Sequence, residues 1–156
     1  SIMVGGDKEH YYLCKSILKP YTKFIKYMGP SGSGQLTKMV NQICIAGLIQ
    51  ALAEGINFSK KVGLETQDVF EVVSKGAAQS WQMDNRWKTM TQDIYDYGFA
   101  VDLMRKDLNI ILNEAKRSDI NLDVTKIINE YYKDIQEFGG GKLDTSSLLK
   151  RLEGLT

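Results

Sequence analysis

Cysteine and histidine are scarce in this sequence of 156 residues, which limits the metal and redox chemistry that it can support. The two cysteines, Cys14 and Cys44, are isolated and show no paired spacing, so we expect reduced thiols in a cytoplasmic protein. His10 is the only histidine. Metal ions in proteins are usually held by clusters of cysteine, histidine and carboxylate side chains. We therefore predict no metal site.

The sequence also lacks an excess of charge of either sign and a long uninterrupted apolar segment. It has 20 Lys and Arg against 19 Asp and Glu, so we expect no strong positive electrostatic potential that would attract nucleic acid or an anionic membrane. The longest apolar run covers residues 43–49 and resumes at 51–53, which is too short for a membrane span and predicts a buried helix. No signal peptide is visible. With 43% hydrophobic and 25% charged residues, the composition is typical of one soluble domain.

Residues 1–29 differ in pattern from the remainder of the chain. A short apolar run at 1–4 and an alternating segment at 22–28 predict two strands. Asp7 is expected to cap a helix over residues 8–18 between them. Two short strands are not stable alone in water. We therefore interpret this segment as the tail of a larger N-terminal α/β domain.

Residues 30–156 predict an all-α domain around one long central helix. Continuous helical periodicity over residues 34–62, apolar on nearly every side at its centre, indicates that this helix is buried. Thr66 is expected to cap the next helix. Further helices are predicted at 66–74, 80–92, 100–116, 124–138 and 145–152. The positions expected to face the core are Leu103, Leu108, Ile111, Leu112 and Ala115 in one helix and Ile127, Ile128, Tyr131 and Ile135 in the next.

A glycine-rich turn at residues 29–34 directly precedes the long helix. Lys38, Asn41 and Gln42 then stand at i, i+3 and i+4, so they share one helical face. Gly34 and the other glycines of the turn would let backbone, and therefore a ligand, come close to that face. A lysine and two carboxamides could handle a proton and orient a small polar substrate.

Two familiar phosphate-binding motifs do not fit this turn. A P-loop requires a lysine directly after its last glycine, where this sequence has Gln35, and Lys38 comes three residues later. The dinucleotide fingerprint requires a third glycine, which is absent after Gly34. Nucleotide binding by this turn alone is therefore disfavoured.

Four segments in order resemble one family of enzymes. The pattern Gly-x-Gly-Gln-x-x-Lys-x-x-Asn-Gln at residues 32–42 is similar to the catalytic-helix motif of the β-hydroxyacid dehydrogenases. That family includes 3-hydroxyisobutyrate dehydrogenase, tartronate semialdehyde reductase and glyoxylate/succinic semialdehyde reductase, with 6-phosphogluconate dehydrogenase as a more distant relative. Three further segments resemble a small-residue turn containing serine, a phenylalanine followed seven residues later by Lys-Asp-Leu, and a closing Asp-x-Ser, at residues 76–81, 99–108 and 144–147.

The resemblance implies that Lys38 is the acid/base of hydride transfer between NAD or NADP and a small β-hydroxy acid or its semialdehyde. Oxidising an alcohol requires a base at the hydroxyl, and the same group, once protonated, donates to the carbonyl oxygen in reduction. We expect partial desolvation and the positive helix end to favour the neutral amine. The resemblance further implies substrate binding by Gly34, Asn41, Gln42 and Ser80, and cofactor binding by Phe99, Lys106 and Asp107.

The same resemblance implies that residues 1–29 end a Rossmann-type domain whose front half, absent from this sequence, binds most of the NAD(P). We therefore expect this chain alone to be folded and inactive, without measurable NAD binding. A homodimer or tetramer is expected through the helical domain, because its long helix is apolar on more faces than one neighbouring layer covers. The alternative is a non-catalytic helical oligomerisation or binding module of the same fold. The choice between NAD and NADP and the identity of the acid or aldehyde are left open.

Overall fold

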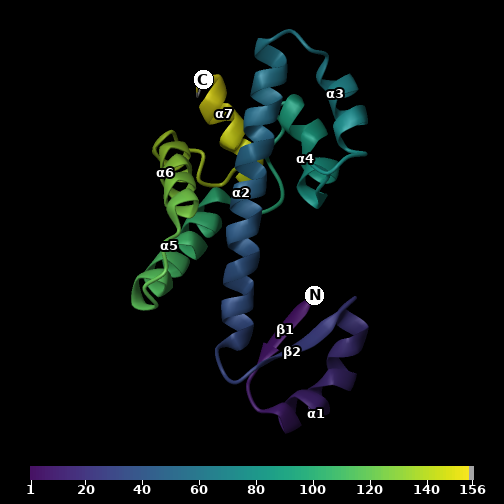
Figure 1. The fold of residues 1–156 in the computed structure, drawn as a ribbon, viewed down its shortest axis with the longest axis vertical. Coiled ribbons are helices and arrows are strands. Elements are labelled where there is room, and N and C mark those ends of the chain that lie inside the picture. The colour runs from purple at the N-terminus through teal and green to yellow at the C-terminus, as the bar shows by residue number, and fades with distance from the viewer. Residues whose placement is uncertain (155–156) are drawn as a thin grey trace. The chain divides into compact units, whose positions relative to one another are not determined.

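The computed structural model describes residues 1–154, which fall into two compact units (Figure 1). The first unit is Ser1–Gln42 and the second is Ile43–Thr156, so the division lies inside the long helix. The domain boundary predicted after residue 29 stays a prediction. The last two residues of the predicted helical domain, 155–156, lie outside the described residues.

The first unit is a strand–helix–strand arrangement, as predicted. Strand β1 (Ile2–Gly5) pairs in parallel with strand β2 (Ile25–Gly29). Helix α1 (Lys8–Leu18) and the short 3-10 helix η1 (Lys19–Tyr21) connect the two strands. A parallel pair requires such a crossover, because a tight turn can join only antiparallel strands.

Asp7 caps α1, which confirms its predicted role. Its carboxylate accepts hydrogen bonds from the backbone amides of Glu9 and His10, at 2.8 and 3.2 Å. These bonds satisfy two amides that have no partner within the helix. They also hold the pKa of the Asp7 carboxyl below its ordinary value.

Helix α2 (Ser33–Lys61) begins and ends within one residue of the predicted bounds. Its first turn lies directly against β1. A Cβ atom added at Gly34 would stand 2.5 Å from the carbonyl oxygen of Met3, so only glycine permits this approach.

By length and composition, α2 could cross a membrane. Its apolar window has a mean hydropathy of 1.4, and 39% of that window is buried in the structure. The apolar run that we expected to be too short for a span thus lies in a helix that is long enough. The core helix of a soluble domain has the same length and composition, so this property alone does not favour a membrane.

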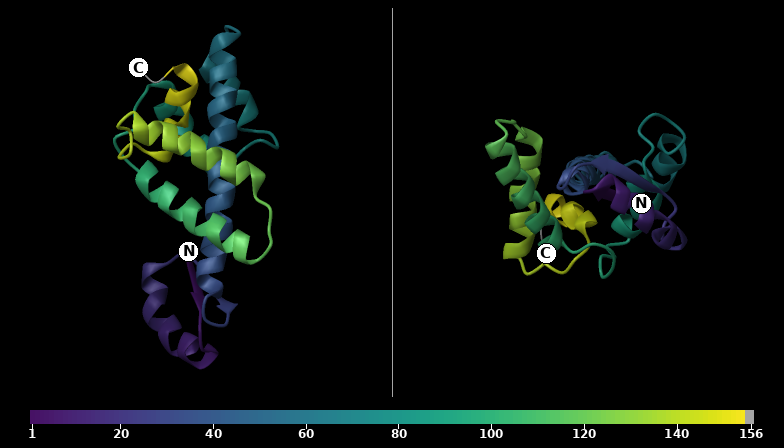
Figure 2. Two further views of the ribbon diagram at one scale, coloured as in Figure 1. Left: turned by 90° about the vertical axis from the view of Figure 1, so that its left-hand side faces the viewer. Right: turned by 90° about the horizontal axis from the view of Figure 1, so that it is seen from below.

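The second unit contains the remainder of α2 and a further set of helices, which confirms the all-α class (Figures 1 and 2). Helices α5 and α6 lie side by side as an antiparallel pair, and α7 packs against α6. The described elements are α3 (Thr66–Val73), α4 (Trp81–Thr91), α5 (Val101–Arg117), α6 (Asp123–Glu137), the 3-10 helix η2 (Thr145–Ser147) and α7 (Leu148–Glu153).

One face of each long helix forms the core of the second unit. Ile49 and Ile56 of α2 are fully buried. Two predicted core positions are wrong, because Leu103 is 45% exposed and Ile127 is 50% exposed. Leu103 lies about 100° around α5 from the neighbouring Met104, which is buried in its place. The buried face of α5 consists of Val101, Met104, Leu108, Ile111 and Ala115.

The predicted cap of α3 is displaced by one residue. Glu65 is the N-cap, and its carboxylate accepts from the amide of Gln67 at 3.4 Å. Thr66 is already the first helical residue, and its carbonyl oxygen accepts a hydrogen bond from the indole nitrogen of Trp87 at 3.1 Å. The capping group therefore comes from the longer side chain directly before the threonine.

Two tyrosines are completely enclosed in the second unit. The hydroxyl of Tyr95 donates to the carbonyl oxygen of Met90 at 3.3 Å, and that of Tyr132 donates to the carbonyl oxygen of Thr145 at 3.2 Å. Burial raises the pKa of both phenols well above the ordinary value, because a buried phenolate would be poorly solvated.

Candidate active site

Three polar side chains near the start of α2 form one hydrogen-bonded cluster. The ammonium group of Lys38 donates to Oε1 of Gln42 at 2.8 Å. The side-chain Nδ2 of Asn41 donates to the same oxygen at 2.9 Å. The i, i+4 spacing accounts for the contact of Lys38 with Gln42, and the third predicted site residue, Asn41, joins the cluster through Gln42.

The members of this cluster differ in their exposure to solvent. Gln42 is buried, with 2% of its surface exposed, whereas Lys38 and Asn41 are exposed. Lys38 belongs to the exposed residues of this chain, and the predicted partial desolvation of its amine stays a prediction. Lys38 and Asn41 are the two members that an incoming small molecule can reach.

A groove of about 430 Å³ lies beside Lys38 within the first unit. Its walls come from β1 and from the first turns of α2, with Ile2, Met3, Val4, Gly5, Gly34, Gln35 and Lys38 as lining residues. Gly34 is part of this wall, but the close approach that it permits is to the backbone of β1. Its structural role is thus the packing of the helix on the strand, and a substrate contact by Gly34 stays a prediction.

Ser80 has a capping role in the second unit. Its hydroxyl accepts a hydrogen bond from the amide of Met83 at 3.1 Å and so begins α4. Ser80 also borders a cavity of about 250 Å³ whose other lining residues are Leu48, Ala51, Leu52, Gly55, Val69, Val73, Ala78, Met83 and Trp87. This lining suits an apolar group better than a carboxylate. The predicted contact of Ser80 with substrate stays a prediction.

The residues predicted to face the cofactor lie at and before α5. The Nζ of Lys106 is 3.2 Å from Oδ1 of Asp107, and the lysine side chain is 62% exposed. A surface pair of this kind contributes less than about 1 kcal/mol to stability. Phe99 precedes the helix, and its backbone amide donates to Oδ2 of Asp144 at 2.9 Å.

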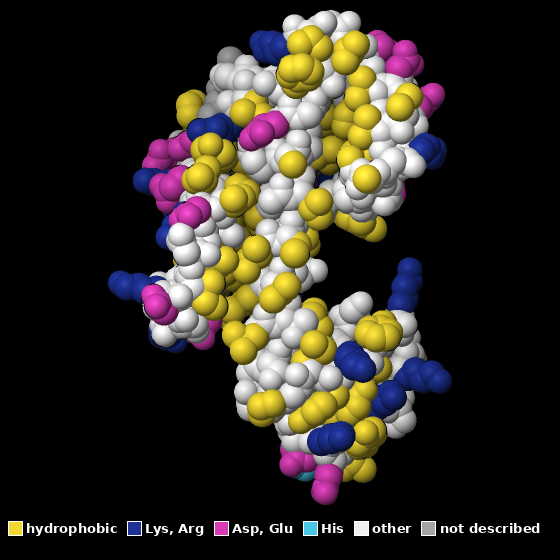
Figure 3. Space-filling view, viewed as in Figure 1, with side chains coloured by type: hydrophobic (Ala, Val, Ile, Leu, Met, Phe, Trp, Pro, Cys, Tyr) yellow, Lys and Arg dark blue, Asp and Glu magenta, His cyan; other side chains and the backbone are white. Residues whose placement is uncertain are grey.

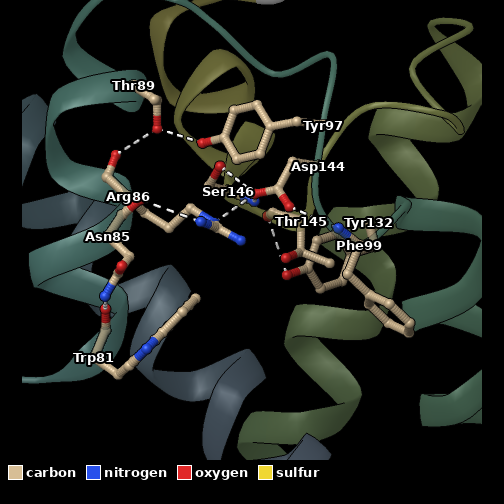
Figure 4. A network of polar contacts seen from close by, with 10 residues as sticks. All are labelled: Trp81, Asn85, Arg86, Thr89, Tyr97, Phe99, Tyr132, Asp144, Thr145 and Ser146. Atoms are coloured by element: carbon tan, nitrogen blue, oxygen red, sulfur yellow. Dashed lines mark hydrogen bonds and ion pairs between the residues drawn. The ribbon is translucent and has the colours of Figure 1, made fainter.

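Asp144 is a fully buried carboxylate that organises the second unit around Phe99 (Figure 4). Its Oδ1 accepts from the amide and the hydroxyl of Ser146, at 3.1 and 2.6 Å. The same oxygen lies 3.2 Å from Nε of Arg86. One carboxylate therefore joins α4, the segment before α5 and η2.

Arg86 lies between two aromatic rings. Its guanidinium carbon is 5.1 Å from the ring centre of Trp81 and 4.9 Å from that of Tyr97, within the range of cation–π attraction (Figure 4). The sequence pattern pointed to Asp144 only as part of a closing segment, and it gave no signal for Arg86. A single arginine on an amphipathic helix looks like a surface residue until the fold shows its partners.

These observations define a helical domain with a lysine–carboxamide cluster at the start of its long helix. A family model described as "NAD-binding of NADP-dependent 3-hydroxyisobutyrate dehydrogenase" matches residues 32–152. The match covers most of the chain, so the chain belongs to this family. The resemblance to β-hydroxyacid dehydrogenases is thereby confirmed at the level of the family, whose cofactor is NAD(P).

Relatives of the chain agree with this assignment. An uncharacterized oxidoreductase of Shewanella frigidimarina is 54% identical over 98% of this chain and 53% of its own length. The 2-hydroxy-3-oxopropionate reductase of Escherichia coli is 34% identical over 98% of this chain and 52% of its own length. The chain thus spans about half the length of these relatives.

A solved structure supports the fold. The Mycobacterium tuberculosis 3-hydroxyisobutyrate dehydrogenase with L-serine matches with a TM-score of 0.88 at 24% identity, over 97% of this chain and 54% of that one. At this identity the likeness concerns the arrangement of the elements.

Proposed function

We propose that this chain is the C-terminal part of an NAD(P)-dependent β-hydroxyacid dehydrogenase or semialdehyde reductase, with Lys38 as its acid/base. The observation that carries the proposal is the hydrogen bond of Lys38 to Gln42, which Asn41 also contacts, beside a groove in a chain that belongs to this family. Lys38 is exposed to an incoming substrate, and Gln42 holds its ammonium group.

Lys38 would exchange a proton with the substrate oxygen. In oxidation, the neutral amine takes the hydroxyl proton as the C–H bond breaks and hydride leaves for the nicotinamide ring. In reduction, the ammonium form returns a proton to the oxygen as the carbonyl becomes an alcohol. A proton acceptor or donor placed in this way typically contributes about 10²–10⁴-fold to the rate.

Asn41 would orient the substrate beside Lys38. It is exposed and donates to Gln42 through Nδ2, which leaves its carbonyl oxygen to accept from a substrate hydroxyl. The classes of substrate that we propose are small β-hydroxy acids and their semialdehydes. The 2-hydroxy-3-oxopropionate named for the relative from E. coli is one such compound.

The exposed side chains at the start of α5 fit a part of the cofactor site. Lys106 presents an exposed ammonium group, and ammonium groups suit the phosphate and carboxamide oxygens of NAD(P). NAD(P) supplies or accepts the hydride. We propose that Lys106, Asp107 and Phe99 contact it and that a further domain of the full-length protein holds most of the dinucleotide, so that residues 1–156 alone are inactive.

The full-length protein is further proposed to be a cytoplasmic homodimer or tetramer that associates through the helical unit. Figure 3 shows apolar side chains exposed over α2 and α3. Phe58 and Val62 of α2 are 65% and 53% exposed, and Val72 of α3 is 75% exposed. Such side chains gain free energy when a second surface covers them.

The Lys38→Met variant of the full-length protein tests the proposed function. We expect kcat to fall by about 10²–10⁴-fold while dinucleotide affinity stays within about twofold, because the lysine acts on the substrate oxygen. The assay follows NADH and NADPH absorbance during reduction of 2-hydroxy-3-oxopropionate and oxidation of 3-hydroxyisobutyrate. Lys61→Met, at the other end of the same helix, is the matched control and should keep the wild-type rate. If Lys38→Met retains more than about a third of kcat, Lys38 is not the acid/base.

A further inference from the structure

One short segment of the helical unit, residues 144–145, holds the backbone of Phe99 on both sides. The amide of Phe99 donates to Oδ2 of Asp144 at 2.9 Å, and the amide of Thr145 donates to the carbonyl oxygen of Phe99 at 2.9 Å. The amide of Asp144 in turn donates to the carbonyl oxygen of Tyr95 at 2.9 Å. Both hydrogen-bonding groups of the Phe99 backbone are therefore fixed by this segment.

The residues just before this segment set where α5 begins. The first amides of a helix have no partner within the helix, and among the described residues no side chain caps α5. Instead, the amides of Val101 and Asp102 donate to the carbonyl oxygens of Leu143 and Gly141, each at 2.9 Å. The first turn of α5 is thus held by the chain that leads into η2.

The approach of the Asp144 carboxylate to Phe99 requires the glycine before the phenylalanine. Gly98 has a φ of +77°, and a Cβ atom added there would overlap Oδ2 of Asp144. Oδ1 of the same carboxylate faces Ser146 and Arg86. The two oxygens therefore have separate roles, since Oδ1 anchors the carboxylate and Oδ2 holds the Phe99 amide.

The charge of Asp144 favours a role beyond stability. Withdrawing a carboxylate and a guanidinium from water costs free energy, and well-packed apolar residues often stabilise a protein as well as a buried ion pair does. A hydrogen bond to a charged carboxylate, by contrast, is short and directional. It fixes the Phe99 amide in direction and distance more strictly than apolar packing would.

The side chain of Phe99 is left available for a ligand. It is only partly buried, and Figure 4 shows its ring pointing away from Asp144 and Arg86. We propose that Asp144 is a positioning residue for the dinucleotide: it does not touch NAD(P), and through Oδ2 it fixes the Phe99 backbone so that the ring meets the cofactor. This inference rests on the proposed contact of Phe99 with NAD(P).

Gly98→Ala in the full-length protein separates Oδ2 from the Phe99 amide and keeps every side chain around Asp144. We expect the Kd for NADH and NADPH, measured by fluorescence titration, to rise about 10-fold or more, because a small displacement of a contacting group is costly. KM for 2-hydroxy-3-oxopropionate at saturating dinucleotide should change by less than about threefold.

Gly139→Ala is the matched control for backbone strain. Gly139 also has a positive φ, of +82°, and a Cβ atom added there would meet no atom of the described residues within 4 Å. This variant carries a similar strain without displacing a carboxylate. We expect its Kd for the dinucleotide to stay within about twofold of the wild-type value. A rise in Kd that both glycine variants share would contradict the role given to Asp144.

Asp144→Asn is a second variant, which adds no strain at Gly98 and decides the question if Gly98→Ala does not fold. Ser146 and Arg86 present several donors to one side of this side chain, so they retain its single carbonyl oxygen. The new NH₂ group then faces the Phe99 amide, and that hydrogen bond is lost. We expect the same rise in Kd and, in both variants, faster hydrogen exchange of the Phe99 amide by about 10-fold or more.

A double variant shows whether Asp144 acts through Phe99. Phe99→Ala alone should weaken dinucleotide binding, because it removes the proposed contact. Adding Asp144→Asn to Phe99→Ala should raise the Kd by less than about twofold further, since the ring that Asp144 positions is already gone. A purely structural role of Asp144 would instead give effects on the Kd that add.

The outcomes separate the inference from the proposed function. If Phe99→Ala weakens binding but a folded Asp144→Asn variant keeps the wild-type Kd, Asp144 does not position Phe99, and additive effects in the double variant lead to the same conclusion. An unchanged Kd in Phe99→Ala would remove the proposed cofactor contact, and the inference with it. The acid/base role of Lys38 is tested separately, by kcat of Lys38→Met.

Discussion

Residues 1–42 and residues 43–154 bury very different amounts of apolar side chain. Among the described residues, Tyr11 is the only buried apolar side chain of the first unit, whereas the second unit buries large side chains from α2 and from α4 to α7. The lysine–carboxamide cluster lies in the lightly packed first unit. Packing and candidate chemistry are thus divided between the two units.

This difference teaches that the two units should respond differently to mutation. Removing a side chain from a closed core leaves a cavity or an unpaired group, which costs several kcal/mol. Removing one from an open unit exposes little that was not already in contact with water. A single substitution should therefore lower the free energy of unfolding more in the second unit than in the first.

The largest expected effect on stability belongs to Asp144→Ala. The change leaves Arg86 and the Phe99 amide without their buried partner, so we expect a loss of about 3–5 kcal/mol of unfolding free energy. Urea denaturation followed by circular dichroism measures it. Asp134→Ala, which removes an ion pair with Arg151 nearer the surface, is the control and should cost less than about 1 kcal/mol. Equal costs for the two variants would contradict the role given to the buried carboxylate.

The next effect tests which face of α2 is covered. Ile49 is fully buried, and Ile49→Ala should cost about 3 kcal/mol through lost burial and the cavity left behind. Leu48 is its neighbour and is 45% exposed, so Leu48→Ala should cost less than about 1 kcal/mol in the monomer. If Leu48→Ala costs as much unfolding free energy as Ile49→Ala in the oligomer, a second subunit covers this face of α2. The difference between the costs of Leu48→Ala in the oligomer and in the monomer then measures that coverage.

A smaller effect concerns alkaline pH. Because burial raises the pKa of Tyr95 and Tyr132 above the unfolded value of about 10, the stability that they provide is complete below that pH. It is lost progressively as the pH rises through 10 toward the folded-state values. Tyr132→Phe should cost about 1 kcal/mol at pH 7, since a buried carbonyl loses its donor, and should flatten the alkaline slope. Thermal melts from pH 7 to 11 give both quantities, and an unchanged slope would speak against the burial of this phenol.

The smallest effect is expected in the first unit. Asp7→Ala removes the cap of α1, so the amides of Glu9 and His10 should exchange with solvent faster while the amides of α5 and α6 keep their rates. Because the pKa of Asp7 is lowered on folding, its stabilisation is present above about pH 4 and is lost as the pH falls further. Hydrogen exchange at pH 6 provides the measurement. If the amides of α5 and α6 also exchanged faster in Asp7→Ala, the two units would unfold cooperatively, and the prediction of an effect confined to the first unit would be wrong.

Much of the fold could be predicted from the sequence, because hydrophobic periodicity and the glycines that begin and end helices are local signals. The bounds of α2 follow from the glycine-rich turn before it and from Gly63 after it, and the structure agrees within one residue. The faces of α5 and α6 were harder to predict. Leu103 and Ile127 are apolar, but their exposure depends on which neighbours the fold supplies.

The candidate site was also predictable in part: the shared helical face could be predicted, but the burial of each side chain could not. The shared face of Lys38, Asn41 and Gln42 follows from their spacing, and the structure shows them in contact. Their different burial does not follow from spacing, because it depends on packing around the helix. Arg86 and Asp144 are 58 positions apart, so only the folded chain could reveal their ion pair.

The long separation in sequence between Asp144 and its partners has a consequence for synthesis on the ribosome. Its partners Arg86 and Phe99 are synthesised much earlier, and Leu148 and Leu149, which are buried in the folded unit, are synthesised later. Closing these long loops is slow compared with forming the local contacts between α5 and α6. The helices of this unit should therefore form before they pack against one another, and a nascent chain stalled before Asp144 has left the ribosome should remain sensitive to protease.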